Sequence, residues 1–118
     1  MIQSYVDLKV WQKSMDLVSN IYALTKKLPE EERFGLTSQM RRAAVSIPSN
    51  IAEGHSRTSG REFARFLSVA QGSKAELETQ LHICERVGIL PQESVKEALD
   101  LCHETGKMLT VLMNKLQK

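Results

Sequence analysis

The side chains that could do chemistry are concentrated between residues 33 and 65. This window holds six arginines, no lysine and only two acidic residues, Glu53 and Glu62, so its local balance is +4 although the whole chain carries +2. Arginine presents a fork of donors that suits phosphate. A cluster of this kind is also often a solvated or ion-paired face. The candidates for contact with RNA or DNA are Arg41, Arg42, Arg57, Arg61 and Arg65.

A line of polar residues runs through the same window at helical spacing. Steps of three and four residues separate Gln39, Arg42, Ser46, Asn50, Glu53 and Arg57, and Ser49 lies beside them. On a helix such residues form one stripe. Serine and asparagine are poor helix formers, so we favour a subunit interface or an otherwise buried stripe. A solvated face with a Glu53–Arg57 pair and direct contact with nucleic acid are the alternatives.

No residue pattern indicates catalysis. The chain has no Gly-rich phosphate loop and no Ser/His/Asp ordering. His55 lies near Glu53 and Ser56, but these residue types are common at the end of a helix. We therefore expect a protein that is not an enzyme and that has no catalytic residues and no cofactor.

Two histidines and two cysteines approach a metal-binding set in composition. Antiparallel helices could bring Cys84 near Cys102, but His82 and Cys84 are two residues apart and point to nearly opposite sides of a helix. His103 adds no usable spacing, because neither a CxxC nor an HxxxH pattern is present. We therefore expect no metal site, and we expect both cysteines to pack in the core.

Length and composition describe the class of protein. The 118 residues make one domain of common size, residues 1–118, in which 42% of residues are hydrophobic and only 5% aromatic. Plentiful Leu, Ala, Glu, Lys and Gln favour helix over sheet. The start of the chain does not resemble a signal peptide, and no apolar run is long enough to span a bilayer. We expect a cytoplasmic protein with no membrane partner.

Helix-breaking residues divide the chain into four amphipathic segments. Pro29, the loop of residues 54–60, and the pair Gly88 and Pro91 separate predicted helices at about 9–28, 37–54, 59–87 and 92–116. Short connections favour antiparallel neighbours. The sequence therefore predicts an all-α, up-and-down antiparallel four-helix bundle.

Each predicted helix has local features of its own. The first has a wide apolar face, made of Trp11, Met15, Val18 and Tyr22 beside Leu17, Ile21, Leu24 and Leu28. In the second, Thr37 or Ser38 is placed to cap the start. In the third, Ser59 and Glu62 are spaced as a capping box, and Gly72 and Ser73 would let a neighbouring helix approach closely.

Pro48 falls inside the second predicted helix. Proline removes one backbone donor and crowds the carbonyl of the residue four positions earlier, which here is Ala44. The apolar spacing continues in phase through it. We therefore expect one helix kinked at Pro48, and the alternative is two short helices broken at Ile47.

One segment resembles the signature of a known family. Gly35-Leu-Thr-Ser-Gln-Met-Arg-Arg-Ala-Ala-Val-Ser-Ile-Pro-Ser-Asn-Ile-Ala-Glu-Gly54 is similar to the signature of the 23S rRNA intervening-sequence proteins, or S23-type proteins. Val10-Trp-Gln-Lys and Arg61-Glu-Phe-Ala-Arg-Phe-Leu fit the same family, and the match covers roughly residues 7–88. The motif includes Gln39, Arg41, Arg42, Ser46, Pro48, Ser49, Asn50, Glu53, Gly54 and Arg57.

The resemblance implies a short bundle that assembles into a homo-oligomer, with a pentameric ring favoured. Some members are encoded inside insertions in bacterial large-subunit rRNA genes. A related bundle is the accessory protein of diversity-generating retroelements, where a basic ring binds nucleic acid and a reverse transcriptase. We therefore expect a non-catalytic oligomer that binds RNA or DNA. The alternative is a scaffold or adaptor oligomer whose partner is another protein.

Overall fold

The structure is a computed structural model that describes residues 4–117. Its long helices are α1 (Lys9–Thr25), α2 (Leu36–His55), α3 (Gly60–Arg86) and α4 (Gln92–Leu116). Two short 3₁₀ turns, η1 (Tyr5–Asp7) and η2 (Glu30–Glu32), precede α1 and α2. No strand occurs between residues 4 and 117. The predicted all-α class is confirmed.

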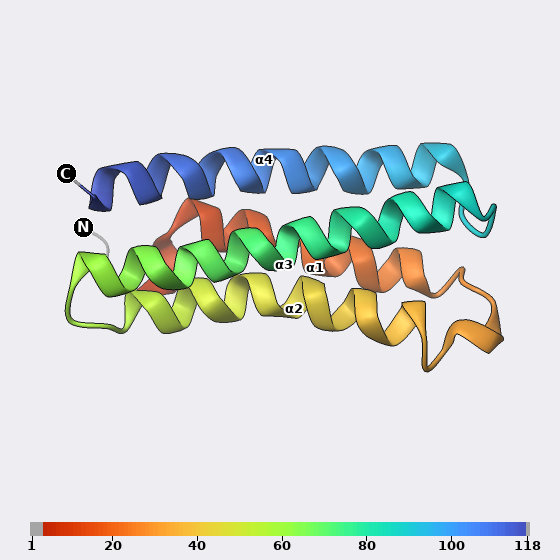
Figure 1. Ribbon diagram of the computed structural model, residues 1–118, viewed down its shortest axis with the longest axis horizontal. Helices are drawn as coiled ribbons and strands as arrows, with labels where there is room; N and C mark the ends of the chain where they lie inside the picture. The colour runs from red at the N-terminus through yellow and green to blue at the C-terminus, as the bar shows by residue number, and fades with distance from the viewer. Residues whose placement is uncertain (1–3, 118) are drawn as a thin grey trace.

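The four helices form an up-and-down antiparallel bundle (Figure 1). Each helix packs against the next along the chain, and α4 also packs against α1, which closes the arrangement. The molecule measures 44 × 22 × 21 Å. The α2–α3 connection lies at the same end as the start of α1 and the end of α4, while the α1–α2 and α3–α4 connections lie at the other end.

The apolar stripes of all four helices meet in one core. The largest side chains without exposure include Leu17, Ile21, Met40, Ile47, Ile51, Leu67, Leu77, Leu81 and Leu109. The wide face predicted for α1 is only partly buried, because each helix of the bundle is covered by two neighbours and not by three. Met15 and Tyr22 are each 40% exposed, and Trp11 and Val18 pack at the edge of the core.

Helix α2 continues through Pro48 without interruption, so the prediction of one helix instead of two is confirmed. The kink at Pro48 stays a prediction. The predicted cap at Thr37 or Ser38 is wrong, since the helix begins at Leu36 and its backbone N–H donates to Oε1 of Glu32 at 3.2 Å. At α3 the prediction is better, because Ser59 Oγ accepts a hydrogen bond from the Glu62 backbone at 3.1 Å.

The first helix is shorter than expected. It ends at Thr25 and not at Leu28. Lys27 donates to the Leu24 carbonyl and Leu28 to the Thr25 carbonyl, each three residues back, so the last turn tightens before Pro29.

Two glycines of the helices have different surroundings. A Cβ at Gly54 would lie 2.7 Å from Phe66 Cβ and 2.9 Å from Phe63 Cδ1, so α2 and α3 approach closely where they are about to connect. Gly72 has open space at its Cβ position, and the close approach of a helix that we expected there is absent. The neighbouring Ser73 does contact α2, since its hydroxyl lies 2.8 Å from that of Ser46.

Candidate nucleic-acid interface

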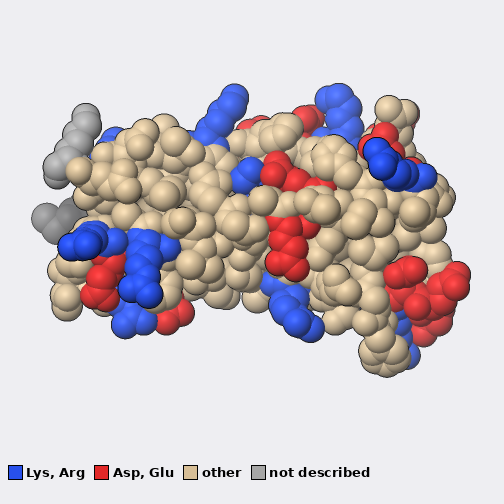
Figure 2. All heavy atoms as spheres, viewed as in Figure 1, with Lys and Arg blue, Asp and Glu red and all other residues tan. Residues whose placement is uncertain are grey.

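The five candidate arginines do not form one continuous surface. Arg41 and Arg42 lie near the start of α2, while Arg57, Arg61 and Arg65 lie beyond its end and on the first turns of α3. At 1.5 Å per residue, the two groups are separated by about 20 Å along the bundle. We call them the α1–α2 group and the α2–α3 group. Figure 2 shows basic side chains gathered at the α2–α3 end and a broad uncharged region next to them.

The α1–α2 group lines a hollow that also contains two aromatic rings. The lining includes Arg41 and Arg42 of α2, Tyr22 of α1, and Arg33 and Phe34 of the connection between η2 and α2. The hollow has a volume of about 540 Å³, within the range of small-ligand sites. Phe34 is 87% exposed. The structure thus brings aromatic rings to arginines that the sequence analysis considered without them.

Contacts with α1 hold Arg41 in place. Its Nε donates to Oγ1 of Thr25 at 2.9 Å, one of its terminal nitrogens donates to the Tyr22 carbonyl at 3.5 Å, and its guanidinium lies over the Tyr22 ring at 4.6 Å. Thr25 is in turn fixed, because its hydroxyl donates to the Ile21 carbonyl at 2.7 Å. Arg41 therefore has a structural role, and its orientation is set by α1.

Arg42 differs from its neighbour. Its side chain is exposed and has no hydrogen-bond, ion-pair or ring partner within residues 4–117. Arg33 is intermediate between the two, because its guanidinium lies 5.2 Å from the centre of the Phe34 ring and 3.4 Å from a carboxylate oxygen of Glu30. Arg42 is thus the arginine of this hollow that is most available to an anion.

Acidic side chains border this hollow. Glu30, Glu31 and Glu32 form the turn η2, and Figure 2 shows an acidic group over the α1–α2 connection. Glu30 pairs with Arg33, and Glu32 accepts from the first backbone N–H of α2. Two of the three carboxylates are therefore engaged within the molecule, which reduces their repulsion of an incoming phosphate.

The α2–α3 group also divides into used and available arginines. Arg57 forms the ion pair with Glu53 that the spacing predicts, at 2.9 Å, and its guanidinium lies 4.8 Å from the centre of the Phe66 ring. Arg61 and Arg65 are exposed and have no such partner in the described part of the chain. Both line a hollow beside the end of α4.

The polar stripe of α2 splits into an internal and an external part. Ser46 contacts Ser73 of α3, and Asn50 Nδ2 donates to the Ser46 carbonyl at 2.8 Å and to its hydroxyl at 3.0 Å. The middle of the stripe therefore joins two helices of the same chain. The rest faces outward, since Gln39, Arg42, Ser49 and Glu53 are exposed.

The cysteines are free and fully buried, as predicted, but they are not neighbours. Cys84 Sγ lies 3.7 Å from Met40 Sδ of α2. Cys102 lies at the level of Glu78, about 9 Å along α3 from Cys84. Burial, and then the charge of Glu78, raise the pKa of the Cys102 thiol to about 12. Within residues 4–117 no three His, Cys, Asp or Glu side chains are grouped to hold a metal ion.

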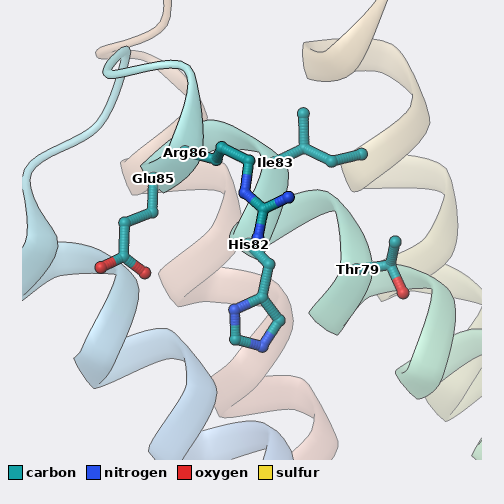
Figure 3. A pocket seen from close by; sticks show the side chains of 5 residues that line it. All are labelled: Thr79, His82, Ile83, Glu85 and Arg86. Carbon is teal, nitrogen blue, oxygen red and sulfur yellow. The ribbon is translucent and has the colours of Figure 1, made fainter.

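A further hollow lies on the outer side of α3, near its end (Figure 3). Its five lining side chains come from a single helix, and they do not converge on a common point. Glu85 points away from Thr79, and His82 lies between them beside Arg86. This arrangement does not resemble an active site, in which acid, base and donor groups face one another. No helix in the described range is long and apolar enough to cross a membrane.

Sequence reasoning missed the aromatic half of the α1–α2 group. Tyr22 follows the apolar spacing of α1, so the pattern placed it in the core. Phe34 stands between Pro29 and Gly35, in a connection where an apolar side chain has no helical face to join. That position was the available signal, because a large apolar residue in a short polar connection is often exposed.

The fold and the surface together define a class: an antiparallel four-helix bundle with two separate groups of outer arginines. The chain belongs to the 23S rRNA-intervening sequence protein family, whose model matches residues 6–111. The predicted resemblance is thus confirmed, and the match extends beyond residue 88 into most of α4.

A solved structure agrees with this assignment. A protein with unknown function from the S23 ribosomal protein family of Bacteroides thetaiotaomicron VPI-5482 is similar at 27% sequence identity, with a TM-score of 0.82. The similarity covers 88% of this chain and 97% of that chain. A comparison with curated proteins gives no match.

Proposed function

We propose that this chain is a non-catalytic helical bundle that binds nucleic acid, RNA or DNA, through its exposed arginines, and that it acts as a homo-oligomer. One observation carries the proposal. Arg42, Arg61 and Arg65 are exposed and have no ion-pair or hydrogen-bond partner within residues 4–117. An ion-paired face was the competing explanation of the cluster, and it accounts for Arg57 but not for these three.

The expected mode of binding is electrostatic and independent of sequence. A free guanidinium can donate two parallel hydrogen bonds to a phosphate, and each phosphate contact releases condensed counterions. The arginine groups stand about 20 Å apart, so one bundle would touch two separate stretches of backbone. With a net charge of only +2, a single chain would bind weakly, and several copies in an oligomer would raise the avidity.

The test is fluorescence anisotropy with labelled RNA and DNA at several salt concentrations. We expect binding at low salt and a loss of affinity as the salt concentration rises. The triple substitution Arg42→Ala, Arg61→Ala and Arg65→Ala should weaken binding and flatten the salt dependence by about three phosphate contacts. Arg86→Ala is the matched control, since Arg86 is also exposed but lies outside both groups. Absence of binding at low salt would refute the proposal.

A scaffold oligomer with a protein partner is the second candidate. It is supported by the outer stripe of α3, where Val69, Ile83 and Val87 are 51%, 42% and 60% exposed. Gly72 lies on the same stripe with open space at its Cβ position. A glycine inside a helix reduces stability by about 1 kcal/mol, and nothing within the chain requires it at this position. A helix of another subunit packed on this stripe would supply the reason.

Light scattering distinguishes the oligomeric and monomeric forms. We expect a homo-oligomer, with the pentamer as the favoured size, and we expect Val69→Asp with Ile83→Asp to dissociate it. Val111→Asp is the matched control, because Val111 is 55% exposed on α4, away from this stripe. A monomer at micromolar concentration would remove both the oligomer and the scaffold.

A further inference from the structure

We infer that the hollow of the α1–α2 group binds the unpaired bases of a single-stranded segment, so that the protein prefers single strands to duplexes. This inference rests on the proposed function and adds the class of nucleic acid. It concerns Tyr22, Phe34, Arg41 and Arg42, which come from two helices and the connection between them.

Phe34 offers a flat apolar surface to solvent. It is the most exposed of the exposed large hydrophobic residues, at 87%. The Arg33 guanidinium lies 5.2 Å from its centre, so a cation already accompanies the ring. Single-strand binding proteins combine these two groups, because bases stack on aromatic rings while arginines follow the phosphates.

Tyr22 and Arg41 supply a second stacking surface on the other side of the lining. The guanidinium plane and the phenol ring lie 4.6 Å apart, and the bonds of Arg41 to Thr25 and to the Tyr22 carbonyl keep them together. Both guanidinium planes and aromatic rings accept stacked bases. A preformed pair loses less conformational entropy on binding than two mobile side chains do.

Arg42 provides the phosphate contact of the same hollow. It is exposed and free of partners among the described residues, whereas Arg33 is drawn toward Glu30 at 3.4 Å. The hydroxyls of Thr37 and Ser38 also line the hollow and can donate to phosphate or sugar oxygens.

A duplex would use only part of this site. Its bases are stacked on one another inside the helix, so the rings of Phe34 and Tyr22 would meet the backbone instead of a base face. Arg42 would still reach a phosphate. Aromatic and arginine substitutions therefore have different expected effects, and this difference is the basis of the test.

The experiment compares labelled single strands of about 12 nucleotides, oligouridine and oligothymidine, with a duplex of similar length. We expect both single strands to bind more tightly than the duplex. Phe34→Ala should lower single-strand affinity by about 5- to 100-fold, the effect of losing one stacked base, and leave duplex affinity unchanged. Phe34→Leu should behave like Phe34→Ala, because leucine keeps apolar bulk without a flat ring.

Arg42→Ala and Val87→Ala are the matched comparisons. Arg42→Ala should weaken both single-strand and duplex binding and lower the salt slope by about one. Val87→Ala removes an exposed apolar side chain from another part of the molecule and should change neither affinity. Phe34 lies outside the core, so the thermal unfolding midpoint of the Phe34 variants should match that of the unsubstituted protein.

The outcomes separate the two proposals. If Phe34→Ala leaves single-strand affinity unchanged, or weakens both ligands equally, while Arg42→Ala weakens both, the stacking inference is overturned and the proposed function stands. If the unsubstituted protein binds neither ligand at low salt, both fall. A preference for oligouridine over oligothymidine would identify RNA as the ligand, and the reverse would identify DNA.

Discussion

The guanidinium of Arg41 on α2 lies 4.6 Å from the centre of the Tyr22 ring on α1, with Arg41 Nε also bonded to Thr25. This contact makes Arg41 part of the packing between two helices, although it adjoins an arginine that is free. Arg41→Ala should therefore lower the free energy of unfolding by about 1 kcal/mol.

Arg42→Ala is the control for Arg41 and should change stability by less than about 0.5 kcal/mol, because the side chain has no partner in the described residues. Urea unfolding followed by circular dichroism measures both. Equal effects of the two substitutions would contradict the division of this pair into a structural and an available arginine.

The two helix glycines should respond oppositely to alanine. Gly54→Ala places a Cβ 2.7 Å from Phe66 Cβ, so we expect a loss of about 1–3 kcal/mol from overpacking. Gly72→Ala meets nothing within the chain and should stabilise the helix by up to about 1 kcal/mol. Urea unfolding of the two variants gives the comparison. If Gly72→Ala instead dissociates an oligomer in light scattering, the outer stripe of α3 is a subunit interface.

The internal part of the α2 polar stripe should matter more for stability than its external part. Ser46→Ala removes the contact with Ser73 and one acceptor of Asn50, and should cost about 1 kcal/mol. Ser49→Ala, in the same helix but exposed, should stay within about 0.5 kcal/mol of the unsubstituted protein. Thermal unfolding checks both, and a larger loss at Ser49 would mean that the stripe is buried from its outer side.

Cys102 should make the fold sensitive to alkaline pH. Its thiol has a pKa of about 12 in the folded chain and near 9 in the unfolded chain, through burial first and the charge of Glu78 second. Below pH 9 both states keep the proton, and above it only the folded state does. Stability is therefore lost as the pH rises from about 9 toward 12.

The measurement is urea unfolding at about pH 8 and pH 10. Between these values the unsubstituted protein should lose about 1 kcal/mol more than Cys102→Ala does. The variant serves as its own reference for lysines and other groups that titrate in the same range. Parallel losses in the two proteins would show that Cys102 ionises in the folded state at its ordinary pKa.

Much of the helical framework could be predicted from the sequence. The spacing of apolar residues and the positions of Pro29, Gly88 and Pro91 placed all four helices within three residues at each end. Helix ends were less predictable, because Glu32 caps α2 from outside it and Lys27 and Leu28 tighten the end of α1. Both effects depend on local geometry that residue spacing does not contain.

The candidate site was predictable only in part. The arginines are visible in the sequence, and so is the Glu53–Arg57 pair, because its four-residue spacing is local to one turn. The other partners come from elsewhere in the chain. Thr25 is 16 residues from Arg41, and Ser73 is 27 residues from Ser46. Such partners depend on which helices pack together and at what register.

The sequence by itself determined the helical class, the antiparallel order and the family, because periodicity, breakers and a long contiguous motif are local properties of the chain. Only the tertiary structure decided which arginines are available. It turned Arg41 onto Tyr22, left Arg42 free, and brought Phe34 into the same hollow. The physical reason is that availability depends on the neighbours a side chain meets after folding, and in this bundle they come from the adjoining helix and connection.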